Sequence, residues 1–185
     1  MSSTASIFRG KLLFVMKGRF LQAIAVVVLT ISGAQAALWD VDITATRLKS
    51  DQEKSRESNV TITTKEIVYK VTVQSRSFKP ITDLQVKYMI FYADVQPGAA
   101  GKPVETSHRG VETFSALDAN KLITFDTKPL KLSVAELDSG WYYTSGAGSR
   151  ARDRVTGVWI RAYSNGKLIG EYTNPSTVGK RDWKE

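Results

Sequence analysis

The sequence predicts an all-β fold, a two-sheet antiparallel sandwich of about seven strands. Apolar and polar residues alternate with a period of two in several separate segments, which is typical of strands with one buried face. Clusters rich in Gly, Pro, Asn and Asp separate these segments, as expected of turns. The sequence shows no long helical period, so helices are not expected to form the core.

The first half of this domain contains three expected strands and one charged segment. Residues 39–46 alternate, with Trp39, Val41, Ile43 and Ala45 on one side. Residues 48–59, LKSDQEKSRESN, are nearly free of apolar side chains, and we expect a solvated loop there. Residues 66–75 alternate again. Residues 84–95 have an apolar second half, which predicts a central strand buried on both faces.

The second half contains weaker signals and one clear hairpin. We expect residues 104–117 to form a strand split at Gly110, and residues 121–127 to form a short strand. Ser133 and Glu136 have the spacing of a capping box, so residues 133–138 predict a single helical turn. Residues 157–173 predict a β-hairpin around Asn165-Gly166.

The register of this hairpin decides which side chains face solvent. A two-residue Asn-Gly loop would mix apolar and charged residues on one face, whereas a three-residue Ser-Asn-Gly loop with a left-handed Gly166 separates them better. We therefore predict the three-residue loop. Its core face would hold Val158, Ile160, Ala162, Leu168 and Tyr172, and its solvent face Trp159, Arg161, Tyr163, Lys167, Ile169 and Glu171.

Two segments carry a resemblance to known domains. The segment VYKVTVQSRSFKPITDLQVKYMIFY, followed by FSALDANKLITFDT, resembles the paired central strands, proline-bearing turn and later edge strand of immunoglobulin-like and fibronectin type III-like domains of exported bacterial proteins. The resemblance covers roughly residues 67–173 and is architectural, and the cysteine pair of true immunoglobulin domains is absent. It implies an exported interaction or structural module.

The N-terminal 36 residues have the pattern of a secretory signal peptide. A basic segment precedes the uncharged run 20–31, and Ala34 and Ala36 give the A-x-A cleavage signature. The apolar run is shorter than the roughly 20 residues that a membrane span needs. We expect cleavage after Ala36 and a secreted or periplasmic chain without a stable membrane span. An uncleaved anchor is the alternative, and Met16 is an alternative start.

The expected organisation is a signal peptide at 1–36, a sandwich at 37–174 and a C-terminal tail at 175–185. The formal net charge is +8, but residues 1–36 carry four basic and no acidic side chains, which leaves +4 for the mature chain. Together with export, this modest charge argues against nucleic acid as the partner. The chain has no cysteine, which excludes disulfides, thiolate metal sites and a cysteine nucleophile. We predict no cofactor.

Three catalytic interpretations have little support. GAGSRA, residues 146–151, fits a phosphate-binding turn, but the residues behind it are too few for the required helix, so we expect a glycine loop. His108 is the only histidine and no G-x-S-x-G turn exists, so we expect an exposed polar residue. The carboxylate pairs are expected on solvated surfaces, and two carboxylates make an incomplete calcium shell. These pairs are Asp40 with Asp42 and Glu136 with Asp138.

A surface-binding interpretation is better supported. Arg150, Arg152 and Arg154 share one parity, which would direct them into the core unless the strand carries a β-bulge at Gly157. With that bulge, the three arginines would join Trp159, Arg161 and Tyr163 on one outward stripe, with Trp141, Tyr142 and Tyr143 nearby. Aromatic stacking and arginine pairing would then suit a sugar-rich or anionic surface. The alternative is that the aromatics are packing residues and the arginines form ion pairs within the chain.

The sequence thus favours an exported, non-catalytic binding or structural module of the cell envelope or secretome, not an enzyme. Its partner would be a cell-envelope glycan or a protein. A carbohydrate-binding module that uses the aromatic and arginine face is the first alternative. A carboxylate-based hydrolase is the second. The sequence determines neither the ligand nor the oligomeric state.

Overall fold

The described strands form two facing layers. The computed structural model describes residues 39–48 and 51–183, and the predicted signal peptide lies outside this range. Eleven strands pair antiparallel throughout these residues, and a 3-10 helix, η1 (Ser176–Lys180), follows the last strand. The prediction of an all-β sandwich is confirmed.

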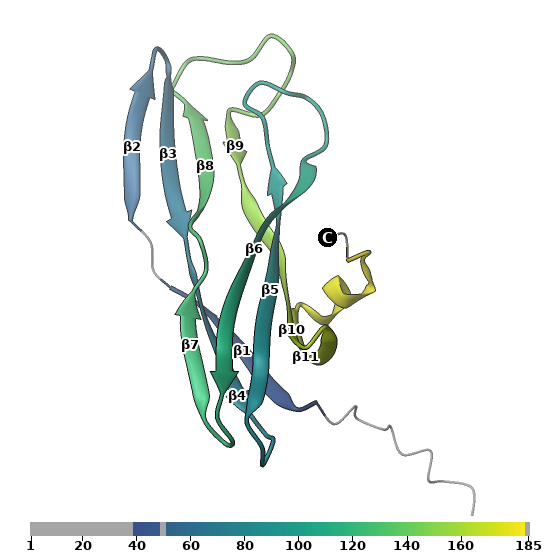
Figure 1. The fold of residues 1–185 in the computed structure, drawn as a ribbon. Coiled ribbons are helices and arrows are strands. Elements are labelled where there is room, and N and C mark those ends of the chain that lie inside the picture. The colour runs from purple at the N-terminus through teal and green to yellow at the C-terminus, as the bar shows by residue number, and fades with distance from the viewer. Residues whose placement is uncertain (1–38, 49–50, 184–185) are drawn as a thin grey trace, which may run out of the picture. The chain divides into compact units, whose positions relative to one another are not determined.

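The first layer contains two sheets, in which the same three chain segments lie side by side in the same order. Its first part has the strand order β1-β4-β7, from β1 (Val41–Arg47), β4 (Tyr69–Ser75) and β7 (Leu122–Asp126). The same segments continue as β2 (Gln52–Glu57), β3 (Val60–Ile67) and β8 (Leu130–Leu137) (Figure 1). The short strand β9 (Arg150–Arg152) pairs with the free side of β8.

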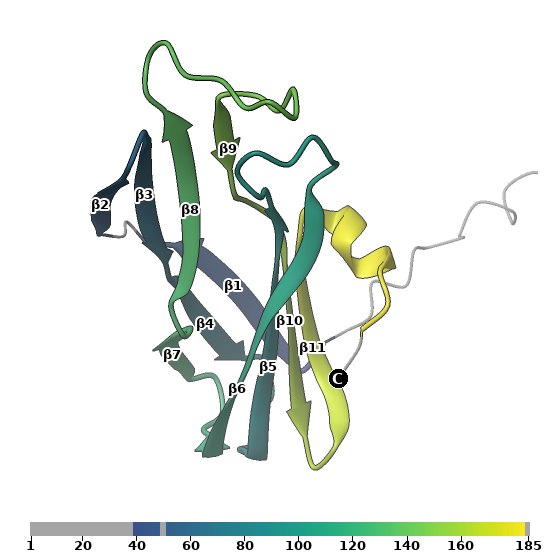
Figure 2. The ribbon, with the colours of Figure 1, turned by 90° about the horizontal axis from the view of Figure 1, so that it is seen from above.

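The second layer has the strand order β11-β10-β5-β6. It consists of β5 (Ile81–Asp94), β6 (Val104–Leu117), β10 (Arg154–Ser164) and β11 (Lys167–Asn174), and Figure 2 shows it facing the first layer. β5 lies between β10 and β6, so the prediction of a central strand there is confirmed. The chain crosses from the first layer to the second at Asp153, between β9 and β10.

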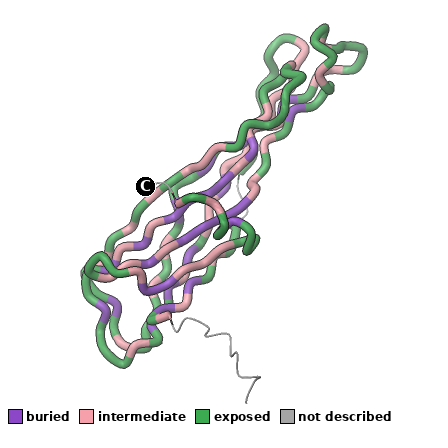
Figure 3. The backbone as a smooth tube through the Cα atoms, turned by 90° about the vertical axis from the view of Figure 1, so that its right-hand side faces the viewer, coloured by how far each residue is buried: buried purple, intermediate pink, exposed green. Residues whose placement is uncertain are grey.

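The main core lies between the two layers. Its fully buried side chains alternate along the paired strands, as period-two patterning requires. They include Val71 and Val73 of β4, Leu84, Val86 and Ile90 of β5, and Ile160 of β10. Figure 3 shows the buried residues along the middle of the strands and the exposed ones at the loop ends. A Cβ at Gly170 would lie 2.4 Å from Val41 Cγ2, so β11 needs glycine where β1 packs directly on it.

Three local predictions are wrong. The segment expected as a loop contains β2, whose side chains are all exposed and whose backbone pairs with β3. The expected helical turn at 133–138 belongs to β8, which pairs with both β3 and β9. β6 runs unbroken through Gly110. Glycine is needed here for packing, because a Cβ would lie 2.1 Å from the hydroxyl oxygen of Tyr88, which accepts the Lys128 N–H.

The hairpin register also differs from the prediction. Ser164 pairs with Lys167, so the loop has two residues, Asn165 and Gly166, both in the left-handed region. The pairing then shifts at Ile169, which is an extra residue in β11. This bulge buries Ile169 in the core and leaves Leu168 half-buried. A two-residue loop without a bulge would mix apolar and charged side chains on one face, and the extra residue prevents this mixing.

The bulge predicted in β10 is present. Val155 pairs with Tyr92 and Gly157 with Phe91, so Thr156 is the extra residue. Val155 consequently packs against the main core and Arg154, opposite Ala93, is exposed. The bulge therefore keeps the arginine out of the core, as the sequence required.

Candidate binding surfaces

The outward face of β10 is covered by the C-terminal segment of the same chain. Trp159 is only 2% exposed and packs with Met89, Phe91 and Val178 in a second, smaller apolar cluster. Trp183 packs edge-on against Trp159, with ring centroids 5.0 Å apart. The prediction that Trp159 faces solvent is therefore wrong, because residues 175–183 fold back over the strand.

Gly157 makes room for this segment. A Cβ at Gly157 would lie 2.2 Å from Val178 Cγ2 and 3.4 Å from the Asn174 carbonyl oxygen. The glycine that permits the bulge thus also forms the hollow into which Val178 inserts.

Arg161 is held between two indole rings. Its Cζ lies 4.4 Å from the Trp159 ring centroid and 4.6 Å from that of Trp183. Glu171 Oε1 accepts hydrogen bonds from Arg161 Nε at 2.8 Å and from Trp159 Nε1 at 2.9 Å. Tyr163 is half-buried beneath Lys87, whose Nζ is 5.2 Å from the ring centroid. Because these groups satisfy one another, this part of the predicted stripe is internal packing.

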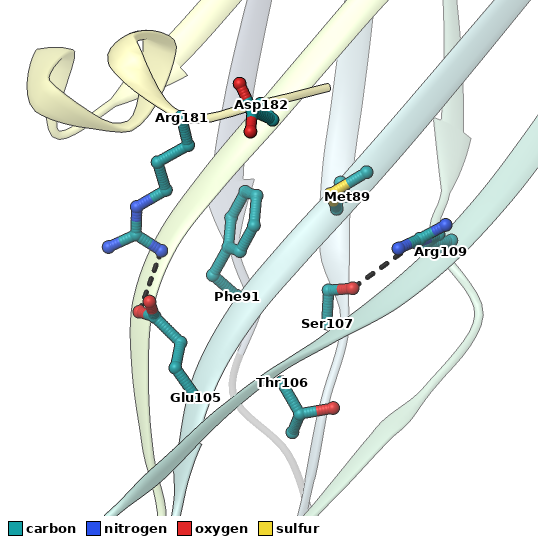
Figure 4. Close-up of a pocket in the computed structure, with 8 residues that line it drawn as sticks. All are labelled: Met89, Phe91, Glu105, Thr106, Ser107, Arg109, Arg181 and Asp182. Atoms are coloured by element: carbon teal, nitrogen blue, oxygen red, sulfur yellow. Dashed lines mark hydrogen bonds and ion pairs between the residues drawn. The ribbon is translucent and has the colours of Figure 1, made fainter. Parts of the chain in front are cut away.

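Two grooves flank the end of the C-terminal segment and share Met89 and Arg109. The first, of about 490 Å³, has Met89 and Phe91 on its floor and side chains of β6 on its wall (Figure 4). Arg181 lies over Phe91, with Cζ 4.7 Å from the ring centroid, and donates to Glu105 Oε1 at 2.7 Å. The second, of about 460 Å³, is lined by Trp183, Val111 and Lys128 among others.

A third hollow, which we name the cationic cleft, lies where the chain changes layers. It has a volume of about 150 Å³ and is lined by four basic residues from four strands, Arg47 of β1, Lys65 of β3, Arg152 of β9 and Arg154 of β10. Ile67, Leu132, Val134 and Val155 supply apolar lining, and Asp153 is the one acidic residue. Within the described residues, none of the four basic side chains has an ion-pair partner.

Among the described residues Asp153 forms no ion pair with the basic side chains of the cleft, because both of its carboxylate oxygens accept hydrogen bonds from neutral donors. Oδ1 accepts the Val95 N–H at 2.9 Å, and Oδ2 accepts the Ser133 N–H and hydroxyl, each at 2.8 Å. Its own N–H donates to the Ser133 carbonyl oxygen at 2.9 Å. These bonds join the crossing point to β8 and to Val95, the residue after β5, and they hold the backbone that carries Arg152 and Arg154.

The single outward stripe predicted from the arginines is wrong. All three arginines are exposed, but only Arg152 and Arg154 line the cationic cleft, whereas Arg150 pairs with Glu136 of the neighbouring strand β8 at 3.9 Å. Trp159 and Arg161 belong to the covered face. Sequence reasoning missed Arg47 and Lys65, which only the strand pairing brings to the cleft.

Two tyrosines near these surfaces titrate abnormally. Burial raises the pKa of Tyr69 above its ordinary value, and the neighbouring Arg47 guanidinium offsets part of this. Burial also raises the pKa of Tyr88, which lines the second groove. The Tyr88 hydroxyl accepts a hydrogen bond from the backbone N–H of Lys128, and this bond lowers the pKa in part.

The segment of residues 138–149, which we name the aromatic loop, carries two exposed rings. Trp141 is 58% exposed and Tyr142 is 82% exposed. Tyr143 packs against Gly98 of the loop 95–103, where a Cβ would lie 3.1 Å from the ring, and Ser145 Oγ donates to the Gly98 carbonyl oxygen at 2.7 Å. The two loops therefore brace each other while Trp141 and Tyr142 stay in solvent.

The remaining predictions concern catalytic chemistry. His108 was expected to be exposed but is half-buried, on β6 opposite Ile90 of β5. Its Nε2 atom is buried and has no hydrogen-bond partner among the described residues. Three of the four candidate carboxylates are ion-paired: Asp42 with Arg76, Glu136 with Arg150 and Asp138 with Arg56. The residues behind GAGSRA form β9 and β10, so no helix follows the glycines.

Comparisons with known proteins give no family. No family model matches the chain, and no curated protein matches it. Solved structures with some likeness include the structural-genomics target SoR45, at 12% identity over 79% of this chain and 96% of that one, with a TM-score of 0.37. The Escherichia coli curli protein CsgC is 12% identical over 69% of this chain and 97% of its own, with a TM-score of 0.30. A protein from Akkermansia muciniphila is 16% identical over 72% of this chain and 71% of its own, with a TM-score of 0.25. At these scores none of the likenesses supports an argument about function.

The described residues contain no helix of sufficient length and hydropathy to cross a membrane. They also contain no group of three or more His, Asp or Glu side chains placed to hold a metal ion.

Proposed function

We propose that this chain is an exported, non-catalytic module with an immunoglobulin-like or fibronectin type III-like sandwich, which binds a cell-envelope glycan through the aromatic loop. The signal-peptide pattern of residues 1–36 supports export. Asp42, Glu136 and Asp138, three of the four carboxylates considered for catalysis, each pair with an arginine of the same chain, which argues against their use as the acid and base of a glycosidase.

The exposure of Trp141 and Tyr142 is the observation that carries this proposal. Large aromatic side chains stabilise a fold mainly by burial, and these two contribute little in that way. Adjacent exposed rings on a braced loop offer flat apolar surfaces at small entropic cost, and such rings dominate many binding interfaces. The apolar faces of sugar rings can stack on them.

The proposal is tested by removing both rings. We expect the double variant Trp141→Ala and Tyr142→Ala to lose about tenfold or more of the retention of the chain on peptidoglycan sacculi or on its strongest glycan-array ligand, as interface aromatics usually do. Co-sedimentation with sacculi and array fluorescence measure the effect.

Phe78 provides a matched control. It is 89% exposed in the turn between β4 and β5, at the opposite end of the strands from the aromatic loop (Figure 1). Phe78→Ala should leave retention unchanged. Equal retention by the double variant and the parent chain would refute the proposal, as would a parent chain that binds neither probe.

A further inference from the structure

We propose that the cationic cleft is a binding site for an oxyanion group, that is, a carboxylate, sulfate or phosphate. This site is separate from the aromatic loop and goes beyond the function proposed above. It rests on the charge of the cleft, its size and the rigidity of its walls.

The charge of the cleft is uncompensated. Four basic residues and one carboxylate give it a formal charge of +3, and the hydrogen bonds of Asp153 direct that carboxylate toward backbone and serine donors. Clefts lined by one sign of charge with low-dielectric walls concentrate the electric field and raise the local concentration of counter-ions. Ile67, 0% exposed, and Leu132, 6% exposed, provide such walls.

Five arginines outside the cleft differ from those that line it. Arg56, Arg76, Arg150, Arg161 and Arg181 each pair with a carboxylate of the same chain. Arg47, Arg152 and Arg154 have no such pair within residues 39–48 and 51–183, although they line one cleft, and like charges gathered in this way repel one another. An anion from outside would remove this repulsion.

The size of the cleft limits what it can hold. Its volume of about 150 Å³ is well below the roughly 300–1,000 Å³ of pockets that enclose a whole small-molecule ligand. The cleft therefore fits one charged substituent, and the rest of a larger ligand would lie outside. Guanidinium groups match carboxylate, sulfate and phosphate oxygens with paired N–H donors, so three arginines favour an oxyanion over a halide.

The walls are held before any ligand arrives. Lys65 and Leu132 are paired between β3 and β8, and Val134 and Arg152 between β8 and β9. The bonds of Asp153 fix the residue between Arg152 and Arg154 to Ser133 of β8 and to Val95, which directly follows β5. Such preorganisation reduces the ordering that binding would otherwise require.

The test measures anion binding by the full-length chain. Thermal unfolding midpoints are recorded in increasing sodium sulfate, inorganic phosphate or sodium acetate, each against sodium chloride at equal ionic strength. We expect a saturable rise of the midpoint above the chloride series for at least one oxyanion, because a ligand that binds only the folded state stabilises it. The acetate arm separates a carboxylate site from a sulfate or phosphate site.

Variants assign the effect to the cleft. Arg152→Gln and Arg47→Gln should each weaken the apparent affinity about tenfold or more, as loss of a charged hydrogen bond does. Arg150→Gln is the matched control, since Arg150 lies two residues from Arg152 on β9 but pairs with Glu136. It should change the affinity less than about twofold. In chloride, Arg152→Gln should unfold no earlier than the parent chain, because it removes an unpaired charge.

Two results would overturn the proposal. One is a midpoint that follows ionic strength alone for all three oxyanions. The other is an equal loss of affinity in Arg150→Gln and Arg152→Gln. Neither result depends on Trp141 or Tyr142, so failure of the anion site can be distinguished from failure of glycan binding at the aromatic loop.

Discussion

The covered face around Trp159 and the cationic cleft around Arg152 differ in how their arginines are partnered. On the covered face, Arg161 lies between two indole rings and pairs with Glu171. Arg152 instead lines a hollow together with apolar side chains and three other basic residues. Both regions contain residues of the short segment 152–161, yet one is covered by the C-terminal segment and the other is open. An arginine that pairs within the chain, such as Arg161, contributes to packing, whereas one without such a pair among the described residues, such as Arg152, is a candidate for binding. The alternation of the sequence alone does not tell the two apart.

The largest expected effect tests whether the covered face is a structural core. Trp159→Ala should lower the free energy of unfolding by about 3–5 kcal/mol, because it removes a buried indole and leaves a cavity beneath Trp183. Urea unfolding measures the change. Trp141→Ala removes the same side chain from an exposed position and should stay within about 0.5 kcal/mol of the parent chain. If the two variants were equally stable, the face could not be a core.

A second variant tests how the C-terminal segment is seated. Gly157→Ala should lower the free energy of unfolding by about 1–3 kcal/mol, because the added methyl group overlaps Val178. The variant should also be cleaved faster by proteases between residues 175 and 183, and mass spectrometry of the fragments measures the rate. Gly148→Ala is the control, since its Cβ would meet only the Arg150 carbonyl oxygen, at 4.0 Å. Cleavage as slow as in the parent chain would mean that the hollow is not needed.

A third pair compares the two kinds of arginine directly. Arg161→Ala should lower the free energy of unfolding by about 1–3 kcal/mol, since it removes two ring contacts and leaves Glu171 without its cation. Arg152→Ala should be neutral or slightly stabilising at low salt. Chemical unfolding in parallel gives both values. An Arg152 effect as large as that of Arg161 would break the distinction between the regions.

The smallest effect concerns alkaline pH. Tyr69 lies beside Arg47 of the cleft, and Tyr88 lines a groove beside the C-terminal segment; both have raised pKa values in the folded chain. The unfolded state therefore loses these protons first, so their contribution to stability is constant below about pH 10 and falls as pH rises further. Unfolding at pH 7 to 11.5 should show a shallower decline for Tyr69→Phe and Tyr88→Phe. Unchanged slopes in both variants would contradict this assignment.

Most of the fold could be predicted because burial leaves a local signal. The apolar second half of residues 84–95 marked β5 as a central strand, and the shared parity of Arg150, Arg152 and Arg154 required a bulge near Gly157. β2 left no such signal, because both of its faces are exposed, and it is held by backbone pairing to β3 and by the ion pair of Arg56 with Asp138. The spacing of Ser133 and Glu136 suggested a helix cap, whereas Ser133 instead donates to Asp153, a contact across 20 residues.

The candidate site was less predictable because it depends on long-range pairing. Parity placed Arg152 and Arg154 together, as the structure does. Arg47 and Lys65 reach the same cleft only through the pairing of β1 with β4 and of β3 with β8. The burial of Trp159 depends on Val178 and Trp183, which local alternation around Trp159 could not reveal.

Asp153 also has a consequence for the order of folding. Its carboxylate bonds close distances of 20 and 58 residues along the chain, and they can form only after β5 and β8 have been brought together. Such non-local closures are typical of slow steps in β-proteins. We therefore expect the arginines on either side of Asp153 to reach their final positions late, so that a chain which has not finished folding presents no complete cleft.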